Sequence, residues 1–246
     1  MTATARTLPL VYINLDEDTQ RRSTIEAACA AVGVSAERLP ATRWSRLNAE
    51  KQAALYSAGL NAHNYYRPML PGEMGCYASH IVAWHRLLAS SAPALVVLED
   101  DVEPRPDFNA VVNAIAALPV AWDMVKLIGR ERERPATRRP LTGGFELVSY
   151  RRVPSLTAGY VISRRGAERL LATRVPFGRP IDEDLRHWWE CGMVMRGVLP
   201  AVIGNADTGS SSSIGVRQRQ TRVDLRFRKF LFKCRYSLAN ALAREP

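Results

Sequence analysis

The chain has 246 residues, of which 47% are apolar, and a formal net charge of +10. That length fits one large domain or two small ones, and the apolar content excludes a disordered chain. The positive charge is local, because residues 217–246 carry a net +7 and residues 130–139 a net +3. A nucleic-acid-binding module presents basic residues on its folded face, so this distribution argues against nucleic acid as a partner.

Cysteine spacing and hydropathy indicate the cellular compartment in which the protein is expected. The four cysteines, Cys29, Cys76, Cys191 and Cys234, are far apart and form no C-x-x-C pair, which argues against a zinc site and a disulfide framework and favours a reducing environment. The N-terminal apolar run is too short for a secretory signal, and no segment approaches the roughly 18 apolar residues of a membrane span. We therefore expect a cytoplasmic protein.

The first half of the chain predicts alternating strands and helices. Strands are expected at residues 8–14, 94–98 and 123–129, and helices at 18–34, 48–59, 73–91 and 107–117, with a loop at 61–72. Such alternation predicts an α/β fold with a mostly parallel, twisted sheet flanked by helices.

The second half is expected to contain a polar loop at 130–144, strands at 145–150 and 156–163, helices at 164–174 and 181–192, an extended apolar segment at 193–204 and a Gly/Ser-rich loop at 205–220. A last helix is predicted over about 221–243. We divide the chain into a main domain, 1–216, and a basic amphipathic C-terminal helix, 217–246.

Three carboxylates follow the second predicted strand, 94–98. This apolar strand runs directly into Glu99, Asp100 and Asp101. In open α/β sheets ligands bind beyond the carboxyl ends of the strands, and clustered carboxylates become favourable when Mg²⁺ or Mn²⁺ neutralises them. The residues alone leave two readings open: a metal site, or an acidic turn that faces water.

Other polar residues suggest substrate contacts, each with a plainer alternative. Asn14 and Arg21 follow the first strand, where an Arg fork suits a phosphate. His80 can bind a phosphate or sugar hydroxyl, or can be a satisfied buried histidine. The acids at 182–184 begin a helix, where the helix dipole already favours them; a general base is the sharper interpretation, with Asp182 and Glu183 as candidates.

Several motifs together resemble glycosyltransferase family 25. In chain order they are VYINLDEDTQRR, GEMGCYASHIVAWHRLL, LVVLEDDV, DMVKLIG, AGYVISRRGAERLL and PIDEDL, within about residues 8–214. The resemblance implies a GT-A type nucleotide-sugar-binding fold and inverting transfer of a hexose, galactose from UDP-galactose in many members, to lipopolysaccharide or another cell-surface glycan. It does not account for the charged loop at 130–144, which is a candidate for acceptor selection.

The resemblance also implies roles for individual residues. Asp101 is expected to hold a Mn²⁺ or Mg²⁺ ion, with Glu99 as a further ligand, and Glu99 or Asp100 to contact the metal shell or the donor ribose. Asn14, Arg21, His80, Asp100 and Gly159 are expected to bind substrate, and Asp182 to act as base with Glu183 beside it. The competing classes are a non-catalytic basic protein that binds membrane or nucleic acid, and a silent relative that only binds sugar nucleotides.

The C-terminal helix carries an apolar stripe on a basic background. Its members share helical spacing and are Phe227, Phe230, Leu231, Cys234, Leu238 and Leu242. Basic residues lie off this stripe, as in helices that lie in the plane of an anionic membrane. We therefore expect a peripheral protein on the inner face of the plasma membrane; the alternative is a stripe that packs on the main domain.

Overall fold

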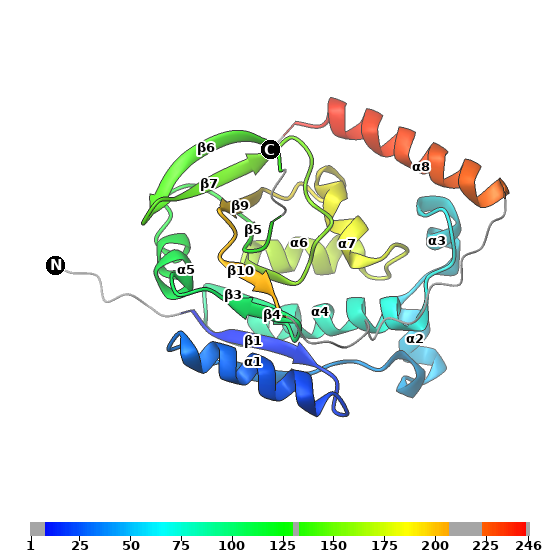
Figure 1. Cartoon of the computed structure of the whole chain (residues 1–246). Coiled ribbons are helices and arrows are strands. Elements are labelled where there is room, and N and C mark those ends of the chain that lie inside the picture. The colour runs from blue at the N-terminus through cyan, green and yellow to red at the C-terminus, as the bar shows by residue number, and fades with distance from the viewer. Residues whose placement is uncertain (1–7, 130–132, 207–222, 245–246) are drawn as a thin grey trace.

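The computed structural model describes residues 8–129, 133–206 and 223–244. It is an α/β structure around an eight-stranded sheet of order β2-β1-β3-β8-β5-β9-β7-β6 (Figure 1). Strands β8 and β7 run against the other six, which share one direction. The predicted α/β class, with a mostly parallel sheet flanked by helices, is confirmed.

The ten strands and ten helical segments of the described residues have these bounds. The strands are β1 Leu10–Asn14, β2 Glu37–Pro40, β3 Ala94–Glu99, β4 Val102–Pro104, β5 Met124–Lys126, β6 Pro135–Thr142, β7 Phe145–Tyr150, β8 Gly159–Ser163, β9 Met195–Leu199 and β10 Ile203–Asn205. The helices are α1 Thr19–Ala31, α2 Ala49–Leu55, α3 Ala58–Asn64, α4 Pro71–Ala89, α5 Phe108–Ala116, α6 Arg164–Arg174, α7 Ile181–Asp184 and α8 Val223–Leu242, with 3-10 turns η1 Trp44–Arg46 and η2 Leu185–Glu190.

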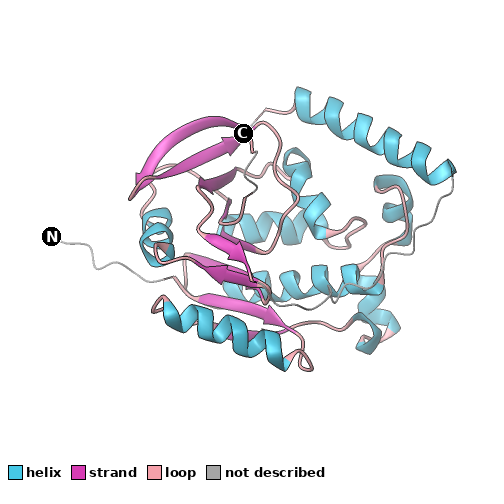
Figure 2. Cartoon of the chain, viewed as in Figure 1, coloured by secondary structure: helices cyan, strands magenta, loops and turns pink. Residues whose placement is uncertain are grey.

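The central strands are mostly apolar because helices cover both faces of the sheet (Figure 2). Along β3, Leu95 and Val97 pack with α4 and α6 on one face, whereas Val96 and Leu98 pack with α1 and α5 on the other. This alternation follows from the two-residue period of a strand. Glu99 therefore ends a strand whose other five residues are buried, and Asp100 and Asp101 follow it.

The charged segment at 130–144 is not the loop we expected. Residues 135–142 form β6, which pairs antiparallel with β7 at one edge of the sheet. Its mostly exposed arginines and two prolines hid the strand pattern, but charge and proline are what keep an exposed edge from pairing with another chain. The sequence also missed β2, whose residues are mostly polar. It predicted one helix at 48–59, whereas α2 ends at Leu55 and most of α3 falls in the segment expected to be a loop.

The first three parallel strands create a crevice. The chain goes from β1 through α1 to β2 on one side, and later returns to β3 on the other side of β1. At such a switch point the connecting segments leave in opposite directions and open a space beyond the carboxyl ends of the strands. Asn14 at the end of β1 and Glu99 at the end of β3 lie at this edge.

The C-terminal helix α8 packs against the rest of the domain through the face that the sequence pattern indicated as polar. Tyr236 is 4% exposed, and its ring lies 5.1 Å from the ring of His187 and 4.3 Å from the Arg186 guanidinium. Phe232 packs against Tyr65 and Tyr66. The expected apolar stripe points outward instead, with Phe227, Phe230, Leu238 and Leu242 each at least 60% exposed. The alternative in which the stripe packs on the domain is wrong.

Two expectations about segments remain predictions. The proposed boundary at 216/217 and most of the Gly/Ser-rich loop fall outside the described residues. In the described part of the chain, no helix is both long and apolar enough to cross a membrane.

Candidate functional site

Asp100, the middle one of the three acids at 99–101, already has partners in the structure. One oxygen of Asp100 accepts a hydrogen bond from Asn14 Nδ2 at 2.8 Å, and the other lies 2.9 Å from an Arg21 nitrogen. Arg38 in turn donates to Asn14 Oδ1 at 3.0 Å. These contacts hold the ends of β1 and β3 together, so Asp100, Asn14 and Arg21 shape the wall of the crevice. Their predicted contacts with substrate stay predictions.

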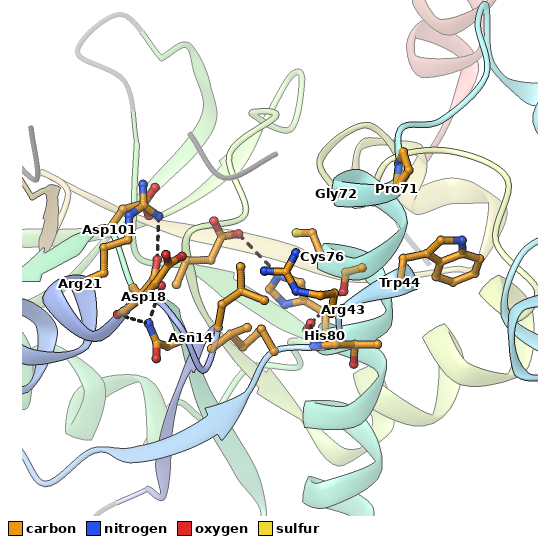
Figure 3. A pocket seen from close by; sticks show the side chains of 18 of the residues that line it. Asn14, Asp18, Arg21, Arg43, Trp44, Pro71, Gly72, Cys76, His80 and Asp101 are labelled. Carbon is orange, nitrogen blue, oxygen red and sulfur yellow. Dashed lines mark hydrogen bonds and ion pairs between the residues drawn. The ribbon is translucent and has the colours of Figure 1, made fainter. Parts of the chain in front are cut away.

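Two cavities meet at the carboxyl edge of the sheet. The first, about 220 Å³, lies between the ends of β1 and β3 and helix α4 (Figure 3). The second, about 990 Å³, extends from there to α7 and the inner face of α8. Both cavities are lined by Arg21, Cys76, Glu99 and Asp101. These four residues therefore mark a junction, which is the place where a molecule in one cavity would touch a molecule in the other.

Asp101 is in an electrostatically unfavourable position at this junction. Burial, and after it the charge of Glu99, raises the pKa of Asp101 from 3.8 to about 6. Arg21 lowers this pKa, but its guanidinium is already paired with Asp100. Carboxylates that are desolvated beside one another, with little compensating charge, are the donor set that suits a hard divalent cation. Asp101 and Glu99 therefore fit the predicted Mn²⁺ or Mg²⁺ ion.

The structure separates the three acids at 182–184 by their partners. Asp184 is buried, with Tyr77 donating to one oxygen at 2.6 Å and Arg179 Nε to the other at 2.8 Å. Glu183 pairs with Arg186 at 2.7 Å. Asp182 lines the second cavity and forms no ion pair with any described residue. Burial and the neighbouring Glu183 raise the pKa of Asp182 to about 6.

A base needs a free carboxylate that faces the reacting group. Of these three acids, only Asp182 combines a place on the cavity with an unpaired side chain. The sequence left the choice among them open, because adjacent residues at a helix start share the same local pattern.

Two predicted binding residues are buried, and only one of them lines a cavity. Gly159 is buried in β8, where a Cβ atom would come within 2.1 Å of Ile203 and 3.1 Å of Leu98. Its neighbour Ala158 lines the second cavity, whereas Gly159 lines neither. His80 lines the first cavity from α4 and is 1% exposed.

Sequence reasoning missed two parts of the site. Arg43 and Trp44 line the first cavity from the turn after β2, and the signal was weak because β2 itself was not recognised. Gly75 brings α4 against this turn, since a Cβ there would lie 2.5 Å from the Thr42 carbonyl oxygen. The inner face of α8 lines the second cavity with Lys229, Phe232, Lys233, Tyr236 and Ser237, although the sequence suggested a separate module.

A family model and several known proteins match most of this chain. A family model described as glycosyltransferase family 25 (LPS biosynthesis protein) matches residues 8–184. A glycosyltransferase 25 family member of Drosophila pseudoobscura pseudoobscura is 30% identical over 185 residues, which cover 72% of this chain and 29% of that relative. Procollagen galactosyltransferase 1 of Danio rerio is 29% identical over 185 residues, covering 70% and 30%.

Two further proteins are similar to this chain over a shorter stretch or at lower identity. A Bos taurus protein named probable inactive glycosyltransferase 25 family member 3 is 33% identical over 129 residues, covering 48% of this chain and 20% of that relative. The chain thus spans less than a third of the length of these relatives. A solved glycosyltransferase involved in glycosylation of the major capsid of PBCV-1 covers 74% of this chain and 65% of its own, with 12% identity and a TM-score of 0.32.

Proposed function

Because the chain belongs to glycosyltransferase family 25, we propose that it transfers a hexose, galactose in the first instance, from a UDP-sugar to a saccharide hydroxyl. The observation that carries this proposal is the meeting of two cavities at Asp101, with the unpaired carboxylate of Asp182 on the second. A transferase needs two adjoining sites, one for the donor and one for the acceptor. Galactose is suggested by the name of the zebrafish relative.

The first cavity suits the donor nucleotide. It lies at the switch point of the sheet, and its lining alternates apolar surface from Ile13 and Trp44 with the polar side chains of Asp18 and Ser79. The diphosphate would then reach the junction. A Mn²⁺ or Mg²⁺ ion held by Asp101 and Glu99 would supply positive charge for the leaving diphosphate.

Asp182 is suited to activate the acceptor with inversion at the sugar carbon. With a pKa of about 6 it is ionised at pH 7 and can take the proton of an acceptor hydroxyl. The hydroxyl oxygen attacks the anomeric carbon as the bond to the diphosphate oxygen breaks. Attack from the second cavity, with the diphosphate toward the first, places nucleophile and leaving group on opposite sides.

The second cavity suits an anionic saccharide. Tyr66, Phe232 and Tyr236 offer aromatic faces to sugar rings. Lys229, Lys233 and Arg152 line the same wall, and none of them lies within 4.0 Å of a carboxylate of a described residue. A glycan that carries phosphate or carboxylate groups, such as lipopolysaccharide, matches this wall. We propose a cell-surface glycan or glycolipid as acceptor.

The outer face of α8 suits an anionic membrane. Five of its large apolar side chains are exposed, namely Phe227, Phe230, Leu231, Leu238 and Leu242. The described helix also carries five basic residues against one acid, and Arg226, Arg228 and Arg235 are the three that do not line the second cavity. Its charge therefore complements an anionic bilayer, where each basic residue near the surface contributes about 1 kcal/mol. We propose that α8 holds the protein on the inner face of the plasma membrane, with the acceptor cavity beside the lipid.

Vesicle co-sedimentation tests the membrane proposal. The full chain should sediment with anionic vesicles, less so at high salt, and not with neutral ones. The double variant Phe230→Ser/Leu238→Ser should lose most of this binding without unfolding, since both side chains already face solvent. Equal sedimentation of variant and wild type would exclude α8 as the docking surface.

Donor turnover tests the transferase proposal. The full chain should hydrolyse or transfer UDP-galactose faster with Mn²⁺ than in chelator, and Asp101→Asn should abolish the stimulation. Glu103→Gln, an exposed acid two residues away, is the matched control and should behave as wild type. Asp101→Asn with metal-stimulated activity within a few fold of wild type would remove Asp101 from the role.

The same assay distinguishes the competing functions. A family relative named as probably inactive makes a silent sugar-nucleotide-binding protein the second candidate. Such a protein would bind UDP-galactose with Mn²⁺ but turn none over. A non-catalytic membrane- or nucleic-acid-binding protein would not respond to the nucleotide sugar at all.

A further inference from the structure

Three metal-ligating groups converge at the junction of the two cavities, apart from the Asp101 carboxylate. They are the Cys76 sulfur, a ring nitrogen of His80 and a carboxylate oxygen of Glu99, which all lie within 4.8 Å of one another. Cys76 and His80 are one helical turn apart on α4 and so share a face, while Glu99 ends β3. Helix α4 thus adds sulfur and nitrogen donors to an edge where the sequence indicated only oxygen.

One ring nitrogen of His80 is hydrogen-bonded and the other is not. Its Nδ1 lies 2.8 Å from the Tyr160 hydroxyl, which also accepts a hydrogen bond from Trp84 Nε1 at 3.0 Å. His80 Nε2 is buried and finds no hydrogen-bond partner among the described residues. A buried polar atom without a partner is costly, so this nitrogen indicates a ligand that binds there.

The tautomer of His80 can meet the requirement of a metal ligand. A phenol oxygen has two acceptor lone pairs, so Tyr160 can accept from Trp84 and from Nδ1–H of His80 together. Nε2 then presents its lone pair toward Glu99, whose Oε1 is 3.5 Å away. Metal-bound histidines commonly donate their other N–H to an oxygen in this way.

The donor set selects a particular class of cation. Thiolate, imidazole and carboxylate together suit Zn²⁺, which in catalytic sites takes three protein ligands and keeps one position open. Mg²⁺ prefers oxygen ligands alone. Zinc bond lengths of about 2.0–2.3 Å place tetrahedral ligand atoms about 3.3–3.6 Å apart, and the 3.5 Å between His80 Nε2 and Glu99 Oε1 fits this spacing.

We propose that Cys76, His80 and Glu99 form a binding site for Zn²⁺, which shares Glu99 with the all-oxygen site predicted at Asp101. The thiol proton of Cys76 leaves when the ion binds. Zinc binding at this site needs neither donor nor acceptor, so it can be measured without the transfer reaction. If the proposed transfer is correct, Zn²⁺ at the junction takes Glu99 and occupies the path of the diphosphate, and it therefore inhibits turnover.

Cobalt spectroscopy on the full-length, metal-free chain tests the site. Co²⁺ should produce a thiolate-to-cobalt charge-transfer band and the visible bands of a tetrahedral ion. Equimolar Zn²⁺ should remove both, whereas excess Mg²⁺ should remove neither. Cys76→Ser should lose the charge-transfer band, and Cys191→Ser, the matched control, should keep it. Tyr160→Phe should weaken Co²⁺ binding by about 10–100-fold, as loss of an outer hydrogen-bond partner does.

A variant-free measurement covers the case in which a substitution prevents folding. In the wild-type chain, Zn²⁺ should protect Cys76 from alkylation, measured by mass spectrometry of its peptide, and leave Cys234 labelling unchanged. The absence of a charge-transfer band, its persistence in folded Cys76→Ser, or unprotected Cys76 would overturn the proposal. The Mn²⁺-stimulated turnover of UDP-galactose is measured separately, so failure of the zinc site does not count against the transferase.

Discussion

Asp182 differs from its two neighbours in having no ion-pair partner among the described residues, and this determines what substitution should do. Asp182→Asn keeps the shape of the side chain and removes the base, so turnover should fall by about 10²–10⁴-fold with little change in donor affinity. Glu183→Gln, which breaks only the pair with Arg186, should cost much less. Initial rates over a range of donor concentrations check both. A collapse of donor affinity in Asp182→Asn would instead place Asp182 in the donor site.

The raised pKa of Asp182 predicts the acid side of the pH–rate profile. A base acts only when ionised, and burial with Glu183 raises this pKa to about 6. The value of kcat/KM should therefore fall below about pH 6, approaching tenfold per pH unit, and level off above it. Glu183→Gln should move the inflection toward lower pH, because it removes a neighbouring negative charge. An inflection that does not move in this variant would contradict the assignment.

At the scale of the element, helix α8 packs one face against the domain and exposes the other to solvent. Tyr236→Ala removes a buried ring that contacts His187 and Arg186, so it should lower the free energy of unfolding by about 1–3 kcal/mol. Leu238 is 65% exposed, so Leu238→Ala should change the free energy of unfolding by less than about 0.5 kcal/mol. Denaturant unfolding measures both. Hydrogen exchange should show α8 loosened only in Tyr236→Ala, and equal effects would refute the two-faced helix.

His187, beneath α8, makes the packing of this helix sensitive to acid. Burial, and then the charge of Arg179, lowers the pKa of His187 from 6.5 to about 4. The unfolded chain therefore binds the proton more readily than the folded one between these values. Stability is fully present above about pH 6.5 and falls as pH approaches 4, by at most about 3 kcal/mol. His187→Gln cannot take up the proton, so its unfolding midpoint should fall less than that of wild type between pH 7 and 5. Parallel pH curves would contradict this account.

At the scale of the whole molecule, the two cavities should respond to donor and cation as one site. Arg21, Glu99 and Asp101 line both, so a diphosphate and a hard cation would meet at the junction. Ligand at 100 times its Kd stabilises the folded chain by about 2.7 kcal/mol, which for a chain of this size raises the Tm by about 5–11 °C.

Thermal unfolding measures this coupling directly. UDP-galactose with Mn²⁺ should raise the midpoint by more than the sum of their separate effects, and Asp101→Asn should remove the excess. Glu103→Gln should keep it. Strictly additive shifts in the wild type would show that nucleotide and cation bind independently.

The sequence by itself determined the parts of this protein that depend on local pattern. A run of apolar residues followed by Glu99, Asp100 and Asp101 predicted a buried strand ending in an acidic edge, and β3 confirms that strand. Alternating strands and helices predicted the layered α/β fold. The ordered motifs from VYINLDEDTQRR to PIDEDL indicated the family to which the chain belongs. These features could be predicted from the sequence because each depends on a few consecutive residues and not on tertiary contacts.

Only the tertiary structure decided which side chains are free to act. By local pattern alone Asp100 and Asp184 resemble Asp101 and Asp182, but Arg21 and Tyr77, which come from distant segments, pair with them. The outward face of α8 likewise depended on the rings of Tyr65 and His187, to which Phe232 and Tyr236 could pack. Charge pairing and aromatic packing depend on residues distant along the chain, and a sequence pattern does not say which of them will meet.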